Sequence, residues 1–150
     1  MPNKPEDHPP LTVWVYSFSY KYLGSPEDES GHGGGFMFDC RGLPNPHWDR
    51  ELRPHHGWEL PIIEFMERHP EVEEFHNHCA ELVVATARIY AARGYERLMV
   101  SFGCTGGKHR SVYQAERMRQ RLESEGIKVV LTHYQRDQDG QNNGLSEHGA

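Results

Sequence analysis

A short apolar segment, a glycine-rich turn and a helix-like repeat follow one another between residues 98 and 122. Residues 98–102 (LMVSF) have the pattern of a buried strand, and the apolar side chains at 112, 115, 118 and 122 recur on one helix face. The turn between them is GCTGGKHRS, residues 103–111. Backbone N–H groups of such a turn and of the helix start can surround an anion. The segment therefore predicts an α/β fold with an anion-binding Gly-rich loop at a strand-to-helix turn.

The rest of the chain carries further strand and helix patterns in an order that narrows the fold. Strands are expected at 11–20, 36–40, 97–102 and 128–133, and helices at 61–69, 71–93 and 108–125. The order ββααβαβ predicts a single-domain α/β sandwich with a mixed, mainly parallel sheet, whose last β–α–β unit is a right-handed crossover. Ligands of such sheets lie at the carboxyl ends of the strands, where residues 39–47 and 103–111 are expected to meet.

The two ends of the chain differ from the segment between them. Residues 1–10 hold four prolines, and residues 135–150 are almost wholly polar, with Leu145 as the one large apolar side chain. Both are expected to be flexible tails around a folded domain at 11–134. No charged-then-apolar leader, no apolar run of about 18 residues and no regular spacing of the three cysteines occur. We therefore expect a cytoplasmic protein without a disulfide framework or a membrane partner.

The charge balance bears on the class of ligand. Sixteen basic and 22 acidic residues give a formal net charge of −6, which disfavours general binding to a nucleic-acid backbone. Residues 103–121, however, carry five basic side chains and one acidic one, a local charge of +4. Such a segment suits a small anion better than a long polyanion. We interpret Arg117, Arg119 and Arg121 as a solvated helix face, with RNA contact as the alternative.

Two common types of site are not supported by residue spacing. The nucleotide P-loop has the pattern G-x-x-x-x-G-K-[ST]; here Phe102 stands where its first glycine is required, and His109 follows Lys108. The 11 histidines form no H-x-x-x-H pair, and the cysteines form no C-x-x-C pair. We expect neither a metal ion nor another cofactor.

The spacing of Cys104 and Arg110 permits an enzymatic interpretation. Five residues separate them and Ser111 follows, which resembles the C-x5-R-S phosphate loop of cysteine-dependent phosphatases. In such a loop the amides and the arginine bind phosphoryl oxygens, and a helix N-terminus lowers the pKa of the thiol. Cys104 would be the nucleophile, with Asp39 or Asp49 as general acid. Alternatively, Cys104 is a small packing residue in a loop that only binds its ligand.

A binding interpretation uses more of the polar residues. The amides of residues 105–108 would hold an anion, the Arg110 guanidinium would clamp it, and Thr105 or Ser111 would add a hydroxyl. Side chains of the 39–47 loop, with His109, could recognise sugar hydroxyls or an amine beyond the anion. The complete set of candidate ligand-binding residues is Asp39, Arg41, His47, Cys104, Thr105, Gly106, Gly107, Lys108, His109, Arg110 and Ser111.

Two long motifs in this chain are similar to those of a known family. They are FDCRGLPNPHW (38–48), followed by ELRP (51–54) and Gly57, and GCTGGKHRSVY (103–113). Together with SFSYKY (17–22), they resemble the C-terminal domain of the RapZ RNase adapter proteins, the YvcJ group. The resemblance extends over about residues 12–134. It implies a fold likened to a sugar-phosphate-binding subdomain of phosphofructokinase.

The resemblance also implies a function. The family's C-terminal domain senses glucosamine 6-phosphate and binds small regulatory RNAs within an oligomer, so a homo-oligomer is expected. The residues that the resemblance assigns to an amino-sugar-phosphate pocket are His47, Thr105, Gly106 and Arg110, with Cys104, Gly107, Lys108 and His109 close by.

Two departures from the family bear on partners. The 150 residues hold no counterpart of the family's N-terminal Walker-type kinase-like domain, so we expect a stand-alone C-terminal-like domain. The family's chain ends in a lysine- and arginine-rich tail, whereas residues 135–150 carry one arginine against Asp137, Asp139 and Glu147. We therefore expect a regulatory domain that binds a small phosphorylated amino sugar. Two alternatives stay open: a cysteine-dependent phosphatase or sugar-phosphate-processing enzyme that uses the C-x5-R-S loop, and an RNA-binding adapter.

Overall fold

Four strands form one sheet at the centre of the molecule, which the computed structural model describes over residues 10–136. They are β1 (Thr12–Ser19), β2 (Phe36–Asp39), β3 (Arg97–Cys104) and β4 (Lys128–His133). Their order is β2-β3-β1-β4, and all three pairings are parallel. The predicted α/β class is confirmed, with a sheet that is parallel in every described pairing rather than mainly parallel.

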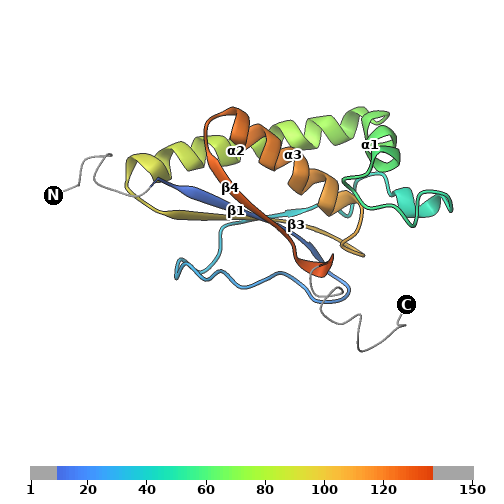
Figure 1. Cartoon of the computed structure of the whole chain (residues 1–150), viewed down its shortest axis with the longest axis horizontal. Helices are drawn as coiled ribbons and strands as arrows, with labels where there is room; N and C mark the ends of the chain where they lie inside the picture. Colours follow the sequence, from blue (N-terminus) through green and yellow to red (C-terminus); the bar gives the residue numbers. More distant parts are fainter. Residues whose placement is uncertain (1–9, 137–150) are drawn as a thin grey trace.

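Three helices cover one side of the sheet. They are α1 (Leu60–Glu67), α2 (Pro70–Ala92) and α3 (Arg110–Ser124), and Figure 1 shows them together on one side, with the loop between β1 and β2 on the other. The predicted apolar stripe of α3 is buried and packs over β1, β3 and β4. Beneath it, Val13 and Val15 of β1 and Phe102 of β3 are fully buried. Burial of this stripe fixes the orientation of α3, and therefore of its first residue Arg110, relative to the sheet.

The connections between the strands place all four carboxyl ends at one edge of the sheet. The chain passes from β2 to β3 and from β3 to β4 through helices on one face. It passes from β1 to β2 in the opposite direction along the sheet and across the other face (Figure 1). All three crossovers therefore have the same hand, as the preference for right-handed crossovers requires.

Some boundaries differ from the sequence-based expectation. β3 extends two residues further, to Cys104, because its backbone is paired with β1 along its full length. α3 begins at Arg110 rather than at residue 108. The 41–48 loop, for which no helix or strand is predicted, contains a 3-10 turn at Pro46–Trp48. Pro46 starts this turn, and the Asn45 side chain accepts from His47 N.

The predicted tails lie mostly outside the described residues, which exclude 1–9 and 137–150. Residues 134–136 form a helical turn directly after β4. Within 10–136, no helix combines the length and the apolar character that crossing a membrane requires.

Candidate functional site

The carboxyl ends of β2 and β3 lie side by side and bring two loops together. Asp39 is in register with Gly103, and Cys40 N donates to the Gly103 carbonyl at 2.7 Å. The loop after β2 and the Gly-rich loop after β3 therefore leave the sheet as neighbours. The expected meeting of residues 39–47 and 103–111 is confirmed.

The end of β1 supports the Gly-rich loop from the opposite side. Ser19 Oγ donates to the Thr105 carbonyl at 2.7 Å, and Tyr20 N donates to the Cys104 carbonyl at 3.0 Å. Gly107 has a φ of +70°, and a Cβ there would lie 2.9 Å from the Cβ of Ser19. Glycine is therefore required at 107 by conformation and by space. At Gly106, by contrast, an added Cβ would meet nothing within 4 Å.

A polar hollow of about 500 Å³, here called the Arg110 hollow, opens between these loops and the start of α2. Its volume falls within the range of roughly 300–1,000 Å³ that is common for small-molecule sites. Its lining residues are Arg41, Gly42, Leu43, Pro44, Asn45, Trp48, Glu71, Thr105 and Arg110.

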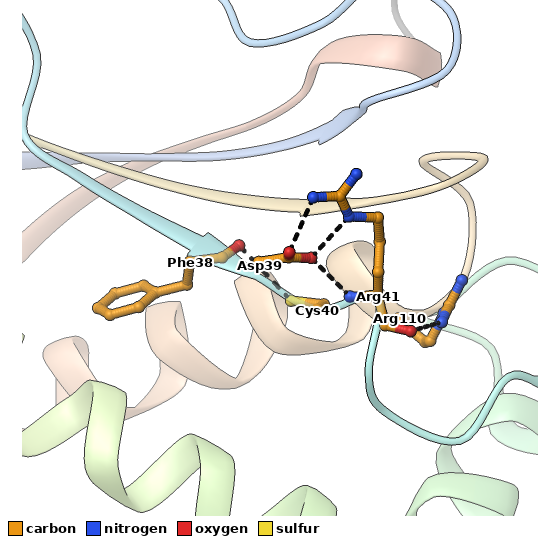
Figure 2. A network of polar contacts seen from close by, with 5 residues as sticks. All are labelled: Phe38, Asp39, Cys40, Arg41 and Arg110. Carbon is orange, nitrogen blue, oxygen red and sulfur yellow. Dashed lines mark hydrogen bonds and ion pairs between the residues drawn. The ribbon is translucent and has the colours of Figure 1, made fainter.

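Arg110 is the buried cation of this hollow. As the first residue of α3 it is 5% exposed. Its Nη1 donates to the Arg41 carbonyl at 2.6 Å (Figure 2) and to the Leu43 carbonyl at 3.3 Å. Its Nε has no hydrogen-bond partner, and no carboxylate of the described residues lies within 4 Å of the guanidinium. Burial of a charge without a counter-ion is unfavourable, so this position favours a bound anion.

Asp39 and Arg41 form a pair at the edge of the hollow. Figure 2 shows the Asp39 carboxylate accepting from Arg41 Nε and Nη2, each at 2.9 Å, and from Arg41 N. These bonds hold the pKa of Asp39 below its ordinary value. The Arg41 guanidinium also lies 3.8 Å from the ring centroid of Tyr20. Asp39 is therefore a stable carboxylate, whereas a general acid needs a carboxyl that is protonated at the working pH.

Cys104 lies behind the loop rather than in the hollow. It is the last residue of β3 and 2% exposed, and its Sγ is 3.1 Å from the Oγ of Ser111, which is also buried. Asp49, the other candidate acid, accepts from Glu51 N and closes the 3-10 turn. These placements fit a packing role for Cys104 better than that of a nucleophile open to a substrate.

His109 and Lys108 hold the segment that follows the 3-10 turn. His109 Nε2 lies 3.3 Å from the Arg53 carbonyl, and burial lowers the pKa of this histidine to about 4. The Lys108 carbonyl accepts from Gly57 N at 3.0 Å. A Cβ on Gly57 would lie 2.5 Å from the carbonyl oxygen of His109. Glycine at 57 thus allows this segment to pack directly on the start of α3.

The candidate residues divide by position. Arg41, Thr105 and Arg110 line the hollow, whereas Cys104, His109 and Ser111 are buried behind it. His47 is exposed on the 3-10 turn, and its ring centroid is 6.4 Å from that of His109. Their roles in ligand binding stay predictions.

The sequence-based candidate set did not include six of the lining residues, which are Gly42, Leu43, Pro44, Asn45, Trp48 and Glu71. Trp48 is 82% exposed and follows directly after His47 within the recognised motif, which was a usable signal. Glu71 belongs to α2, and no local pattern connects it with the Gly-rich loop.

A second concavity of about 600 Å³, here called the Trp58 groove, lies further along α3. Its lining residues are Gly57, Trp58, Ile63, Glu67, Glu73, Tyr113, Glu116, Arg117 and Gln120. The arginine in it, Arg117, donates to both carboxylate oxygens of Glu73, at 2.7 and 3.0 Å.

The other two arginines of the suspected RNA patch are also paired. Arg119 contacts Glu116 and Glu123, and Arg121 contacts Glu125. Over the described part of the chain, no group of three or more metal-ligating side chains is gathered.

Comparison with known proteins places this fold and loop in context. The family model described as the RapZ C-terminal domain matches residues 11–137. A protein named "Nucleotide-binding protein" from Glaesserella parasuis is 42% identical over 82% of this chain and 41% of its own length. Proteins of the same name from Streptomyces griseus and Histophilus somni are 42% and 39% identical, over 85% and 88% of this chain and 37% and 44% of their own lengths. The chain thus spans about two-fifths of the relatives it matches.

Proposed function

The chain belongs to the RapZ C-terminal domain family, and on that premise we propose that it binds a small phosphorylated sugar of the glucosamine 6-phosphate type in the Arg110 hollow. The domain would act as a ligand-responsive regulatory module rather than as a catalyst. The phosphate would lie at the start of α3, beside Arg110 and Thr105.

The observation that carries this proposal is the state of Arg110. A guanidinium that is 5% exposed, with Nε unpartnered and no carboxylate within 4 Å among the described residues, lines a hollow of ligand size. A phosphate would supply both the missing charge and acceptors for charge-assisted hydrogen bonds. The N-terminus of α3 adds the positive end of its dipole at the same place.

Isothermal titration calorimetry with glucosamine 6-phosphate tests the proposal. The wild-type protein should bind, and Arg110→Ala should weaken binding by about 1.5–3 kcal/mol, the usual contribution of a charge-assisted hydrogen bond. Arg117→Ala on the same helix is the matched control, because that arginine already has Glu73 as its partner. A folded wild-type protein that binds neither this compound nor related sugar phosphates at millimolar concentration would refute the proposal.

The relatives' name raises nucleotide binding as another possibility. The chain spans only about two-fifths of those proteins, and the loop at 103–111 departs from the P-loop pattern at Phe102 and His109. We therefore favour a sugar phosphate over a nucleotide at this loop. A titration with ATP under the same conditions, expected to give no heat of binding, compares the two directly.

The enzymatic alternative depends on Cys104. The C-x5-R-S spacing supports it, while the burial of Cys104 and the pairing of Asp39 with Arg41 weigh against it. A phosphatase assay of the wild type and Cys104→Ser decides between the two. Turnover that the substitution abolishes would favour the enzyme, whereas binding without turnover favours the regulatory module.

RNA binding through α3 has less physical support. Arg117, Arg119 and Arg121 each have a carboxylate partner, so little positive charge is left for a phosphate backbone. A gel-shift titration with structured RNA at moderate salt is expected to show no salt-sensitive complex.

A further inference from the structure

We infer that Glu71 is the residue that selects an amino sugar phosphate over a neutral one in the Arg110 hollow. This inference rests on the proposed function and adds to it the group that recognises the amine. The carboxylate of Glu71 would accept a charge-assisted hydrogen bond from the ligand's ammonium group. The phosphate would be held at the opposite pole of the hollow by Arg110.

The hollow is lined by charges of both signs, which are here called its positive and negative poles. Its lining contains two guanidinium groups and one carboxylate. Arg41 is neutralised by Asp39, so Arg110 is the positive pole. Glu71 is the negative pole, and within residues 10–136 it has no ion-pair or hydrogen-bond partner. A ligand with one anionic and one cationic group would complement both poles, whereas a neutral sugar phosphate would complement only one.

The two poles are held apart by the fold. Arg110 begins α3 and Glu71 lies in the first turn of α2, so each side chain starts from a helix end rather than from a free loop. The two groups line one hollow of about 500 Å³, yet they are not within the 4 Å of an ion pair. A small molecule that carries its two charges on either side of a sugar ring would therefore contact both groups from within the hollow.

Trp48 forms an open wall of the same hollow and supports the same ligand class. It is 82% exposed, and over the described residues no aromatic or cationic side chain packs on its ring. Tryptophan is the aromatic residue with the strongest attraction for a cation over its face. An exposed indole and a carboxylate that has no partner among residues 10–136 line the same hollow, and both groups attract an ammonium ion.

A role of Glu71 in helix stability is the alternative explanation. Acidic residues in the first turn of a helix interact favourably with its dipole, and α2 carries both Glu71 and Glu73 there. That role would affect folding but would not distinguish between two ligands that differ only in an amine. The test therefore uses the ratio of two affinities rather than one affinity.

Calorimetry at neutral pH with glucosamine 6-phosphate and glucose 6-phosphate provides that ratio. We expect the wild type to prefer the amino sugar by roughly tenfold, the effect of one charge-assisted hydrogen bond in a partly exposed site. Glu71→Gln should remove the preference by weakening the amino sugar alone. Glu74→Gln is the matched control, because Glu74 is exposed on the same helix and does not line the hollow.

The possible outcomes separate this inference from the proposed function. If Glu71→Gln weakens both sugar phosphates equally, or leaves their affinity ratio unchanged, Glu71 does not select the amine and the inference is wrong while the proposed function stands. If the wild type binds neither compound, the proposed function fails and the inference fails with it. If Glu74→Gln abolishes the preference to the same extent, the effect is one of general charge and the inference is wrong.

Discussion

Arg110 and Arg117 lie two turns apart on α3 and have opposite electrostatic situations. Arg117, in the Trp58 groove, donates to both oxygens of Glu73 and to the Tyr113 hydroxyl, and these bonds raise its pKa above the ordinary value. Arg110, in the Arg110 hollow, is more deeply buried, and within residues 10–136 it donates only to the backbone carbonyls of Arg41 and Leu43.

The difference shows which of the two arginines has a carboxylate partner within the described part of the protein and which does not. The Glu73–Arg117 pair is a structural link between α2 and α3 that needs no ligand. Arg110 links the start of α3 to the 41–43 loop but keeps its charge uncompensated, so the folded protein gains most there from an added anion. Two concavities of similar volume thus differ in whether the arginine that lines them already has a carboxylate partner among the described residues.

Acid should destabilise both regions, because each has a buried histidine that must stay neutral. His76, which interacts electrostatically with Glu73 and Arg117, and His109, behind the Arg110 hollow, both have the pKa lowered by burial from 6.5 to about 4. The unfolded chain takes up these protons near pH 6.5, whereas the folded chain does so only near pH 4. The free energy of unfolding should therefore have its full value above pH 6.5. It should fall by roughly 3 kcal/mol per histidine as the pH drops to 4.

Urea denaturation between pH 7 and pH 4 measures this effect in the wild type and in His76→Leu and His109→Leu. Each substitution should flatten the pH dependence, and His78→Gln, at an exposed position of the same helix as His76, should not. A pH dependence that survives both leucine substitutions unchanged would show that these histidines are not the groups responsible.

Ligand should stabilise the protein through Arg110 and not through Arg117. At a glucosamine 6-phosphate concentration of 100 times Kd, mass action should raise the free energy of unfolding of the wild type by about 2.7 kcal/mol. Arg110→Gln should lose this gain. Arg117→Gln should keep it and instead start about 1 kcal/mol less stable without ligand, a small loss because Glu73 is half exposed. Denaturation curves with and without ligand measure this difference. Equal stabilisation of the two variants by the ligand would contradict the expected difference between Arg110 and Arg117.

Gly106 and Gly107 of the Gly-rich loop should differ in how much an added side chain destabilises the protein. Gly107→Ala should lower the free energy of unfolding by about 1–3 kcal/mol, because its positive φ and its contact with Ser19 both oppose a side chain. Gly106→Ala should leave it nearly unchanged, since an added Cβ meets no atom within 4 Å. Thermal unfolding of the two variants side by side is sufficient, and equal losses would contradict the loop geometry described above.

The smallest expected effect concerns the exposed Asp39–Arg41 pair. Arg41 lowers the pKa of Asp39. The contribution of this pair to the free energy of unfolding is therefore fully present above the ordinary carboxyl pKa of 3.8 and is lost only as the pH falls below it. Both side chains are about half exposed, so Asp39→Asn should lower the free energy of unfolding by less than about 1 kcal/mol. NMR titration of the Asp39 carboxyl measures its pKa directly, and an ordinary value would contradict the pairing.

Much of the fold could be predicted because it is encoded locally. The stripe on α3 and the apolar runs of β1 and β3 appear in short windows, and the structure differs from their predicted bounds by only a few residues. The Gly-rich loop was found the same way, since its glycines and charged residues are contiguous. The 3-10 turn at Pro46–Trp48 was not among the predicted elements; it is only three residues long, and it begins at a proline, which suits the first position of a helical turn.

The candidate site could be predicted only in part. The order of residue types in a loop does not show which side chains face outward. Here the side chains of Cys104 and Ser111 both lie in the interior of the protein. Glu71 was not included because it comes from α2, where no local pattern connects it with residues 103–111. Trp48 was not included although it directly follows the candidate His47. Their convergence depends on how α2 packs beside α3.

The sequence by itself determined the elements, their order, the family and the chemistry of the Gly-rich loop, because periodicity, turn residues and contiguous motifs are properties of short segments. Only the tertiary structure decided which charges meet. It gave Arg117 a carboxylate from α2 and left Arg110 facing a hollow with an unpaired Glu71 across it. The reason is physical: the energy of a buried charge depends on its neighbours in space, and α2 and α3 bring those neighbours from segments some 40 residues apart.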